Sequence, residues 1–251
     1  MSDDKYVLFL DILGFGKLVQ KNTSEQLKQI YDSEIHQTAG MCTSLSAATF
    51  KEAQDFEFLS SKSGKLVDVR QKEINFHVMS DSIIAWTNDI EISSFIKLCQ
   101  FAATYLSMTL ILGLPHRGGI SKGSLFKIQL PLNGIMQTNV TGIGLVNAHK
   151  LEAAQEWMGC VVDSNCINDK VRILMKGENF PITEYNVPYK KETRTVSNFA
   201  INWTLFDIGL VGDFDFYKKQ FERHNKGYSD SINTKVENTY RFYLDKKTDK
   251  V

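Results

Sequence analysis

The sequence predicts an α+β sandwich in which helices pack on a mainly antiparallel sheet. Three observations support this fold class: a continuous apolar run at residues 6–10, two strand-like runs at 74–79 and 82–87, and a long apolar helical segment after them. The order of elements, β–α–β–β–α–β followed by more of both kinds, is typical of helices layered on an antiparallel sheet.

The first segment of the chain is a strand that ends at an aspartate. Residues 6–10 (YVLFL) have the unbroken apolar pattern of a central strand, and Asp11 follows directly. Two glycines then turn the chain. Thr23 and Ser24 supply an N-cap for a long helix that begins at EQLKQIYDSEIHQ.

The next segments are an insertion, a hairpin and a core helix. Residues 50–70 mix Lys, Ser, Gly and Asp, which indicates a surface insertion. The runs at 74–79 and 82–87 form a hairpin around Ser80 and Asp81. The apolar stretch at 95–112 is 18 residues long but carries several polar side chains, so we expect a buried amphipathic helix and no membrane span.

The remaining elements follow from shorter patterns. We expect a second hairpin formed by 117–123 and 124–130, a helix over 142–157 and a strand at 160–162. A further strand is expected at 199–205, and two helices follow Phe214.

Composition excludes several classes of protein. The 251 residues fit one domain over 1–251, and the 29 basic and 29 acidic side chains cancel, which argues against broad binding of nucleic acid or an anionic membrane. The four cysteines show no CxxC spacing and no signal peptide precedes them, so we expect reduced thiols in a cytoplasmic protein. They are Cys42, Cys99, Cys160 and Cys166.

Two aspartates are candidate metal ligands because of where they stand. Asp11 closes a buried strand, where an isolated carboxylate is costly, and Asp81 occupies a tight turn between two apolar strands. If the hairpin lies beside the first strand, both carboxylates meet at one end of the sheet and suit Mg²⁺ or Mn²⁺ bound together with phosphates. The structural alternative is a helix cap at Asp11 and an ordinary turn residue at Asp81.

Four segments resemble the catalytic domains of class III nucleotidyl cyclases, in the family's order. FLDILGFGKLV resembles the opening FxDIxGF motif, and VMSDSIIAW the second metal-binding hairpin. RGGISKG is similar to the RxGIxxG strand, and GIGLVNAHKLE to the helix GxxVNxAxRLE. The resemblance implies a ferredoxin-like core over about 5–165 and an extension over about 166–251.

Further details resemble the bacterial Pycsar pyrimidine cyclases. These are the segments RGGI, AINW at 200–203 and KVENTYRF near the C-terminus. Those proteins are stand-alone anti-phage enzymes that make cyclic UMP or cyclic CMP, and the resemblance implies such an activity here, with UTP placed before CTP.

The resemblance assigns roles to residues of this chain. Asp11, Asp81 and the Ile12 carbonyl would hold two Mn²⁺ or Mg²⁺ ions while the ribose 3′-hydroxyl attacks the α-phosphorus and pyrophosphate leaves. The turn that includes Phe15 and Gly16 would contact the triphosphate.

Departures from the family's pattern concern the base and the transition state. His77 stands where purine cyclases have a lysine that reads the base, and Asn139 stands where they have an aspartate. Val146 occupies the slot of the transition-state asparagine, with Asn147 beside it, and Lys150 occupies the arginine slot.

Arg117 and Lys122 are further candidates for phosphate contacts. Arg117 serves equally well as a structural cation at a strand end. Because both halves of the family's site are on one chain, the resemblance implies a homodimer with composite sites, a nucleoside triphosphate substrate, and neither nucleic acid nor membrane as a partner.

Three other functions stay open at this point. An adenylate or guanylate cyclase would need unusual base-reading residues at 77 and 139. A cyclase-homology module without activity is favoured by Val146 and Lys150 but disfavoured by the two aspartates. A nucleic-acid-binding ferredoxin-like domain is disfavoured by zero net charge and by the lack of an aromatic RNP-type strand.

Overall fold

The computed structural model describes residues 4–48, 73–132, 135–177, 179–191, 197–206, 212–227 and 230–248. The strands are β1 (Asp4–Ile12), β2 (Ile74–Met79), β3 (Ser82–Thr87), β4 (His116–Ser124), β5 (Phe126–Leu132), β6 (Ile135–Thr141), β7 (Gly159–Val162), β8 (Ile182–Glu184) and β9 (Phe199–Ile201). The α-helices are α1 (Phe15–Lys21), α2 (Ser24–Gln29), α3 (Gln37–Ala48), α5 (Ile92–Ile111), α6 (Ile143–Ala153), α7 (Asp169–Leu174), α8 (Phe214–Glu222) and α9 (Asp230–Thr248). Shorter helices are the π-helix η1 (Ile30–His36) and the 3₁₀ turns η3 (Ser164–Cys166) and η4 (Trp203–Phe206).

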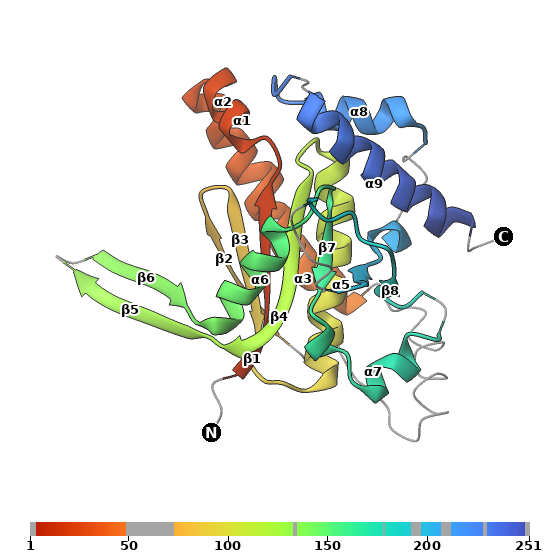
Figure 1. Ribbon diagram of the computed structural model, residues 1–251. Helices are drawn as coiled ribbons and strands as arrows, with labels where there is room; N and C mark the ends of the chain where they lie inside the picture. The colour runs from red at the N-terminus through yellow and green to blue at the C-terminus, as the bar shows by residue number, and fades with distance from the viewer. Residues whose placement is uncertain are drawn as a thin grey trace.

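One sheet of seven strands organises the molecule, in the order β2-β3-β1-β4-β7-β9-β8 (Figure 1). Neighbouring strands are antiparallel except β4 and β7, which are parallel. Helices cover the sheet, so the predicted α+β class with a mainly antiparallel sheet is confirmed. β1 lies between β3 and β4, and Val7, Leu8 and Leu10 are fully buried, as expected of a central strand.

Helix α5 is the core helix on one face of the sheet. It packs on β1, β3 and β4, and α3 lies beside it. Within the described residues, α5 is the one helix that is long and apolar enough to cross a membrane. However, 89% of its most apolar 18-residue window is buried inside the protein. The expected buried helix is confirmed, but its polar positions are buried too: Thr104 donates a hydrogen bond to the Gln100 carbonyl oxygen at 3.0 Å.

Helix α6 lies on the opposite face and packs on β4 and β1. It comes close because β4 carries glycines there: a Cβ on Gly119 would lie 2.6 Å from the Leu151 Cβ, and one on Gly123 would lie 2.9 Å from the Gly144 nitrogen. Small residues at 119 and 123 therefore allow the helix backbone to approach the strand.

The expected hairpin of 117–123 with 124–130 is wrong. β4 runs unbroken over His116–Ser124 and pairs with β1 along its whole length, from His116 with Ile12 to Ser124 with Asp4. β5 instead pairs with β6 in a separate two-stranded ribbon, which projects from the body of the molecule (Figure 1). Of the glycines that suggested a turn, Gly119 and Gly123 allow α6 to approach, whereas a Cβ on Gly118 would meet Leu10 and Phe9 of β1.

The long helical segment after α1 begins where the N-cap pattern predicts. Thr23 forms a capping box with Gln26, whose backbone nitrogen donates to the Thr23 hydroxyl at 3.3 Å. α2, η1 and α3 follow one another directly, so the expected long helix is present with a π-helical segment inside it. The expected insertion at 50–70 lies outside the described residues.

The C-terminal part adds strands and two helices to the far edge of the sheet. The expected helix over 142–157 ends at Ala153, because Gln155 forms a β-bridge with Tyr189. The strand expected at 160–162 is confirmed within β7, whereas the strand expected at 199–205 stops at Ile201. There the chain turns into η4, and Trp203 packs with its ring centroid 5.7 Å from that of Phe242 in α9.

All four cysteines are free thiols in the interior. The two expected helices after residue 214 are present as α8 and α9, which pack against each other. This pair lies above the end of the sheet where β1 stops (Figure 1).

Candidate active site

Asp11 and Asp81 meet at the end of β1. Asp11 is opposite Ser82 in the register of β1 and β3, and Asp81 is in the two-residue turn that joins β2 to β3. Ser80 takes a left-handed conformation with φ 56°, and the Ile12 backbone nitrogen donates to the Asp81 carbonyl oxygen at 3.0 Å. This backbone hydrogen bond holds the turn against β1, and a hydrogen bond joins the two carboxyl groups.

The electrostatics of the pair fit a cation. The pKa of Asp11 is raised to about 7, first by burial and then by the charges of Glu152 and Asp81, while the charge of Arg117 opposes the shift. Two carboxyl groups in contact repel when both are ionised, and a divalent cation between them would replace the shared proton. The residues at this end of the sheet therefore fit a hard divalent cation.

A cation bound by Asp11 and Asp81 would need further ligands besides these two carboxylates. Among the described residues, no group of three or more His, Cys, Asp or Glu side chains is arranged to hold a metal ion. Backbone oxygen, water and substrate phosphates are the usual remaining ligands of Mg²⁺ in such sites. Ile12, the expected source of a backbone ligand, is buried directly after Asp11.

Arg117 is engaged by the helix behind it. It is opposite Asp11 in the register of β1 and β4, and its Nε donates to the Glu152 Oε1 at 2.6 Å, with a second contact from Nη2 to the same oxygen. Its Nη1 donates to the Gln155 carbonyl oxygen at 2.8 Å. The described contacts are those of the structural cation, and they fix a positive charge beside Asp11.

Lys122 does not belong to this end of the sheet. It is opposite Tyr6, five residues along β4 from Arg117, which is on the order of 17 Å at 3.4 Å per residue. Glu152 belongs to the site through its contact with Arg117, but it is not among the residues predicted from the sequence. It is the final glutamate of the helix motif GIGLVNAHKLE, and that position in the motif could have identified it.

His77 lies on the same face of the sheet as Asp11. It is half-buried and opposite Ile84, which in turn is opposite Phe9, two residues before Asp11 on β1. Residues directly opposite one another share a face, so His77 stands two strands away from β1, a lateral distance of about 10 Å. A group of nucleotide size would span such a distance.

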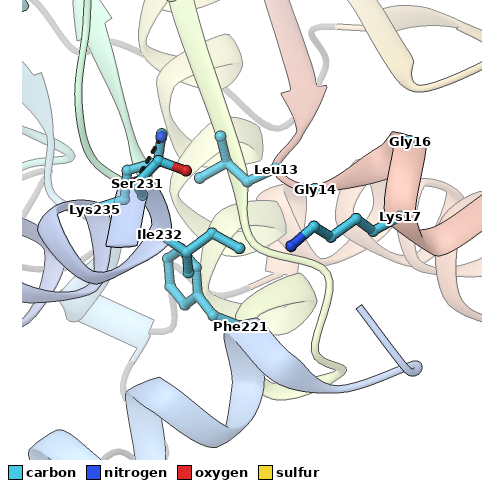
Figure 2. Close-up of a pocket in the computed structure, with 8 residues that line it drawn as sticks. All are labelled: Leu13, Gly14, Gly16, Lys17, Phe221, Ser231, Ile232 and Lys235. Carbon is cyan, nitrogen blue, oxygen red and sulfur yellow. Dashed lines mark hydrogen bonds between the residues drawn. The ribbon is translucent and has the colours of Figure 1, made fainter. Parts of the chain in front are cut away.

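The turn after β1 opens onto a cavity of about 300 Å³ (Figure 2). Gly14 has φ 82°, a conformation that favours glycine, and its carbonyl oxygen accepts from the Lys17 nitrogen at 3.1 Å. Phe15 is half-buried against the core and Gly16 is exposed. The cavity is lined from this side by Leu13, Gly14, Gly16 and Lys17, and from the C-terminal helices by Phe221, Ser231, Ile232 and Lys235.

The remaining sequence candidates lie on other elements. Asn147 is half-buried and Lys150 is exposed on α6, whereas Asn139 is exposed on β6, opposite Ile128 in the projecting ribbon. In the described part of the chain, no hydrogen bond or ion pair joins these three residues to Asp11 or Asp81. The described contacts therefore bring together Asp11, Asp81 and Arg117 beside the turn, and they include none from the α6 and β6 candidates to the two aspartates.

Tyr31 is a further residue at the site that sequence patterns did not identify. Its hydroxyl donates to the Ser80 carbonyl oxygen at 2.8 Å, and burial, then the charge of Asp81, raises its pKa. It belongs to the π-helix η1, and such segments are frequent at functional sites. No sequence signal other than this position in a long helix could have found it.

Comparison with known proteins gives matches among solved structures. No family model matches the sequence, and no curated protein matches it significantly. The fold is similar to a bacterial light-regulated adenylyl cyclase, at 12% identity and a TM-score of 0.49, over 88% of this chain and 57% of that one. It is also similar to the adenylyl cyclase CyaB from P. aeruginosa, at 16% identity and a TM-score of 0.43, over 79% and 93% of the two chains. A third neighbour is the guanylyl cyclase domain of the RhoGC fusion protein from Blastocladiella emersonii, at 14% identity and a TM-score of 0.41, over 65% and 80%.

Proposed function

We propose that this chain is a nucleotidyl cyclase acting on a pyrimidine nucleoside triphosphate, UTP before CTP. The observation that carries the proposal is the contact between Asp11 and Asp81 at one end of the sheet, with the Gly14–Gly16 turn and its cavity beside them. The four collinear motifs that resemble class III cyclases fall on β1 with its turn, on the β2–β3 hairpin, on β4 and on α6.

In this reaction the ribose 3′-hydroxyl loses its proton to solvent, its oxygen forms a bond to the α-phosphorus, the bond from that phosphorus to the bridging oxygen of the β-phosphate breaks, and pyrophosphate leaves. Asp11, Asp81 and the Ile12 carbonyl would hold two Mn²⁺ or Mg²⁺ ions, which when bound lower the pKa of the hydroxyl and neutralise phosphate charge. The chain's own part is to position the substrate. The turn at Phe15 and Gly16 offers backbone N–H groups to phosphates, and Arg117 adds positive charge.

His77 supports the choice of a pyrimidine. It lies on the Asp11 face of the sheet, and a neutral imidazole can donate one hydrogen bond and accept one. That capacity suits the O4 and N3 edge of uracil or the N4 and N3 edge of cytosine. Asn139 is the second proposed base-reading residue.

We further propose a homodimer with composite sites. No described hydrogen bond or ion pair links Asn147, Lys150 or Asn139 to the aspartates of their own chain, and in this proposal they serve the site of a second copy. Exposed apolar side chains lie on the same helix and on the strand paired with β6, at Val146 of α6 and at Phe126 and Ile128 of β5, as expected of a surface that another chain covers.

Mixing two inactive variants tests the composite site. Asp11→Asn and Lys150→Ala should each be impaired, and their mixture should regain activity, because each mixed dimer has one intact site and one doubly damaged site. Native mass spectrometry checks subunit exchange. No recovery in a proven mixed dimer would exclude the arrangement.

On the basis of the resemblance to Pycsar enzymes, we propose that the product is a signal in bacterial anti-phage defence, made in the cytoplasm. The direct experiment is incubation with Mn²⁺ and each of the four nucleoside triphosphates, with products identified by mass spectrometry. We expect 3′,5′-cyclic UMP or cyclic CMP together with pyrophosphate. A cyclic purine product would make the chain an adenylate or guanylate cyclase.

A nucleotide-binding module without activity is the second candidate, and Val146 favours it. That side chain stands in the slot of the transition-state asparagine and is 46% exposed. Binding of a triphosphate in calorimetry with no cyclic product from any of the four would support the module over the enzyme.

A further inference from the structure

The cavity beside the candidate site is built jointly by the two ends of the chain. The β1–α1 turn forms one wall and helices α8 and α9 form the other, although more than 200 residues separate them in sequence. Figure 2 shows the Lys17 side chain extending from α1 toward Ile232 of α9, with Lys235 on the far side. The cavity therefore has an ammonium group on each of two opposing walls.

The charge of these walls is positive. Lys17 and Lys235 line the cavity, and no acidic side chain is among the described residues that do so. Burial lowers the pKa of Lys235, the charges of Arg117 and Lys190 lower it further, and Glu156 opposes them. Arg117, which acts on Lys235, is also opposite Asp11 in the register of β1 and β4.

The other walls favour a small polyanion. Leu13, Phe221 and Ile232 are apolar, and low-dielectric walls strengthen the attraction between an ammonium group and an anion. The Ser231 carbonyl oxygen accepts from Lys235 Nζ at 2.9 Å, which orients that ammonium group. A volume of about 300 Å³ admits two linked phosphate groups at the lower end of the usual range for ligand pockets.

We propose that this cavity is a diphosphate subsite in which Lys17 and Lys235 bind the terminal phosphates of the substrate and hold the pyrophosphate that leaves. The proposal rests on the proposed function and deepens it. Helix α9 is then part of the active site: the C-terminal extension supplies in the same chain a positive charge that the four motifs do not contain.

The test is a calorimetric titration with inorganic pyrophosphate in the presence of EDTA, so that binding does not depend on added metal. The wild-type chain is compared with Lys17→Gln, Lys235→Gln and Lys235→Arg, each first shown to melt as the wild type does. Lys219→Gln removes the same charge from an exposed position on α8 and is the matched control.

We expect each glutamine variant at 17 or 235 to weaken pyrophosphate binding about tenfold or more, because charge-assisted hydrogen bonds are lost. Lys235→Arg and Lys219→Gln should bind within about threefold of wild type, since both leave a cation in the cavity wall. Uridine, which has the base and ribose without phosphate, should not compete. Equal binding by wild type and both glutamine variants, or displacement of pyrophosphate by uridine, would overturn the subsite.

The outcomes also separate this proposal from the proposed function. Pyrophosphate binding that depends on Lys17 and Lys235 in a chain that cyclises none of the four triphosphates would keep the subsite and reject the cyclase. Cyclic product from a chain whose pyrophosphate binding is unchanged in both glutamine variants would do the reverse.

Discussion

Asp11 and Asp81 come together because of two backbone facts. β1 ends beside the turn of the β2–β3 hairpin, and the hydrogen bond from the Ile12 nitrogen to the Asp81 carbonyl oxygen fixes that turn at 3.0 Å. A buried carboxyl next to another is unfavourable when both are charged, which is why the pKa of Asp11 is raised to about 7. A divalent cation bound at this end of the sheet would relieve the repulsion between the two carboxylates, so the pair favours cation binding.

His77 allows a test of base recognition at the level of one residue. His77→Ala should lower turnover of the preferred pyrimidine triphosphate by roughly ten- to a hundredfold, because a lost buried polar contact costs about 1–3 kcal/mol. The preference over the other bases should narrow as well. Steady-state rates with four triphosphates measure both effects.

His36→Ala is the matched control, since His36 is exposed on η1 and should leave rates and preferences unchanged. Unchanged base preference in a folded His77→Ala enzyme would move base recognition to another residue, with Asn139 the next to examine.

Residue patterns predicted part of the candidate site and missed the rest for a physical reason. Asp11 and Asp81 were identifiable because a carboxylate at the end of an apolar strand or inside a hairpin turn is conspicuous. The sequence allows Arg117 to be either a phosphate-binding residue or a structural cation. Its hydrogen bond to Glu152 at 2.6 Å shows that, among the described contacts, it is a structural cation. Tyr31 and Lys235 reach the site through tertiary packing of distant elements, which local patterns do not encode.

The contact between α6 and β4 allows a test at the level of elements. Gly119→Ala should lower the free energy of unfolding by about 1–3 kcal/mol, the usual cost of overpacking, because the new Cβ would lie 2.6 Å from the Leu151 Cβ. Because α6 carries Asn147 and Lys150, activity should fall with it. Urea unfolding followed by circular dichroism gives the stability.

Gly40→Ala should have the opposite effect on the free energy of unfolding in the same assay. Gly40 is inside helix α3, and a Cβ added there would meet nothing within 4 Å, so alanine should raise the free energy of unfolding by about 0.5–1 kcal/mol. Equal stability of Gly119→Ala and the wild type would show that α6 can shift without cost.

Elements with strong patterns were predictable, whereas the segment after β4 was not. The β2–β3 hairpin and the helices α5, α8 and α9 follow from apolar periodicity and turn residues. The glycines of β4 indicated a turn, but Gly119 and Gly123 are explained by the close approach of α6 to the strand, which only the packed structure shows. The pairing of β5 with β6 was also not predictable, because nothing in 124–130 distinguishes one antiparallel partner strand from another.

At the scale of the whole molecule, the titration of one buried lysine, Lys226, should change the free energy of unfolding with pH. Lys226 is 2% exposed, its Nζ donates to the Gly113 carbonyl oxygen at 2.7 Å, and burial lowers its pKa to about 7 against the opposing charge of Glu34. Above the folded pKa the native chain has lost this proton while the unfolded chain keeps it up to about pH 10. The unfolded state therefore binds more protons between these values, and stability should rise with pH from about 7 to 10.

The contribution of one group is at most about 1.4 kcal/mol per pH unit. Urea unfolding of the wild type and of Lys226→Met at pH 7, 8 and 9 measures it, and the slope of stability against pH should be shallower in the variant. Comparison within the same buffers removes the contributions of other groups. Parallel slopes would mean that Lys226 keeps its proton when folded.

If Asp11 and Asp81 together hold the catalytic metals, the rate of cyclic nucleotide formation by Asp11→Asn will show it. The change removes one charged ligand at constant volume, and it also removes repulsion from Asp81 and Glu152, so the fold should be at least as stable as in the wild type. With Mn²⁺ and the preferred triphosphate, we expect a rate at least about a hundredfold below wild type at an equal or higher melting temperature, since a lost metal site costs several kcal/mol of transition-state stabilisation. A folded Asp11→Asn variant that forms the cyclic product at a rate near that of the wild type would contradict it.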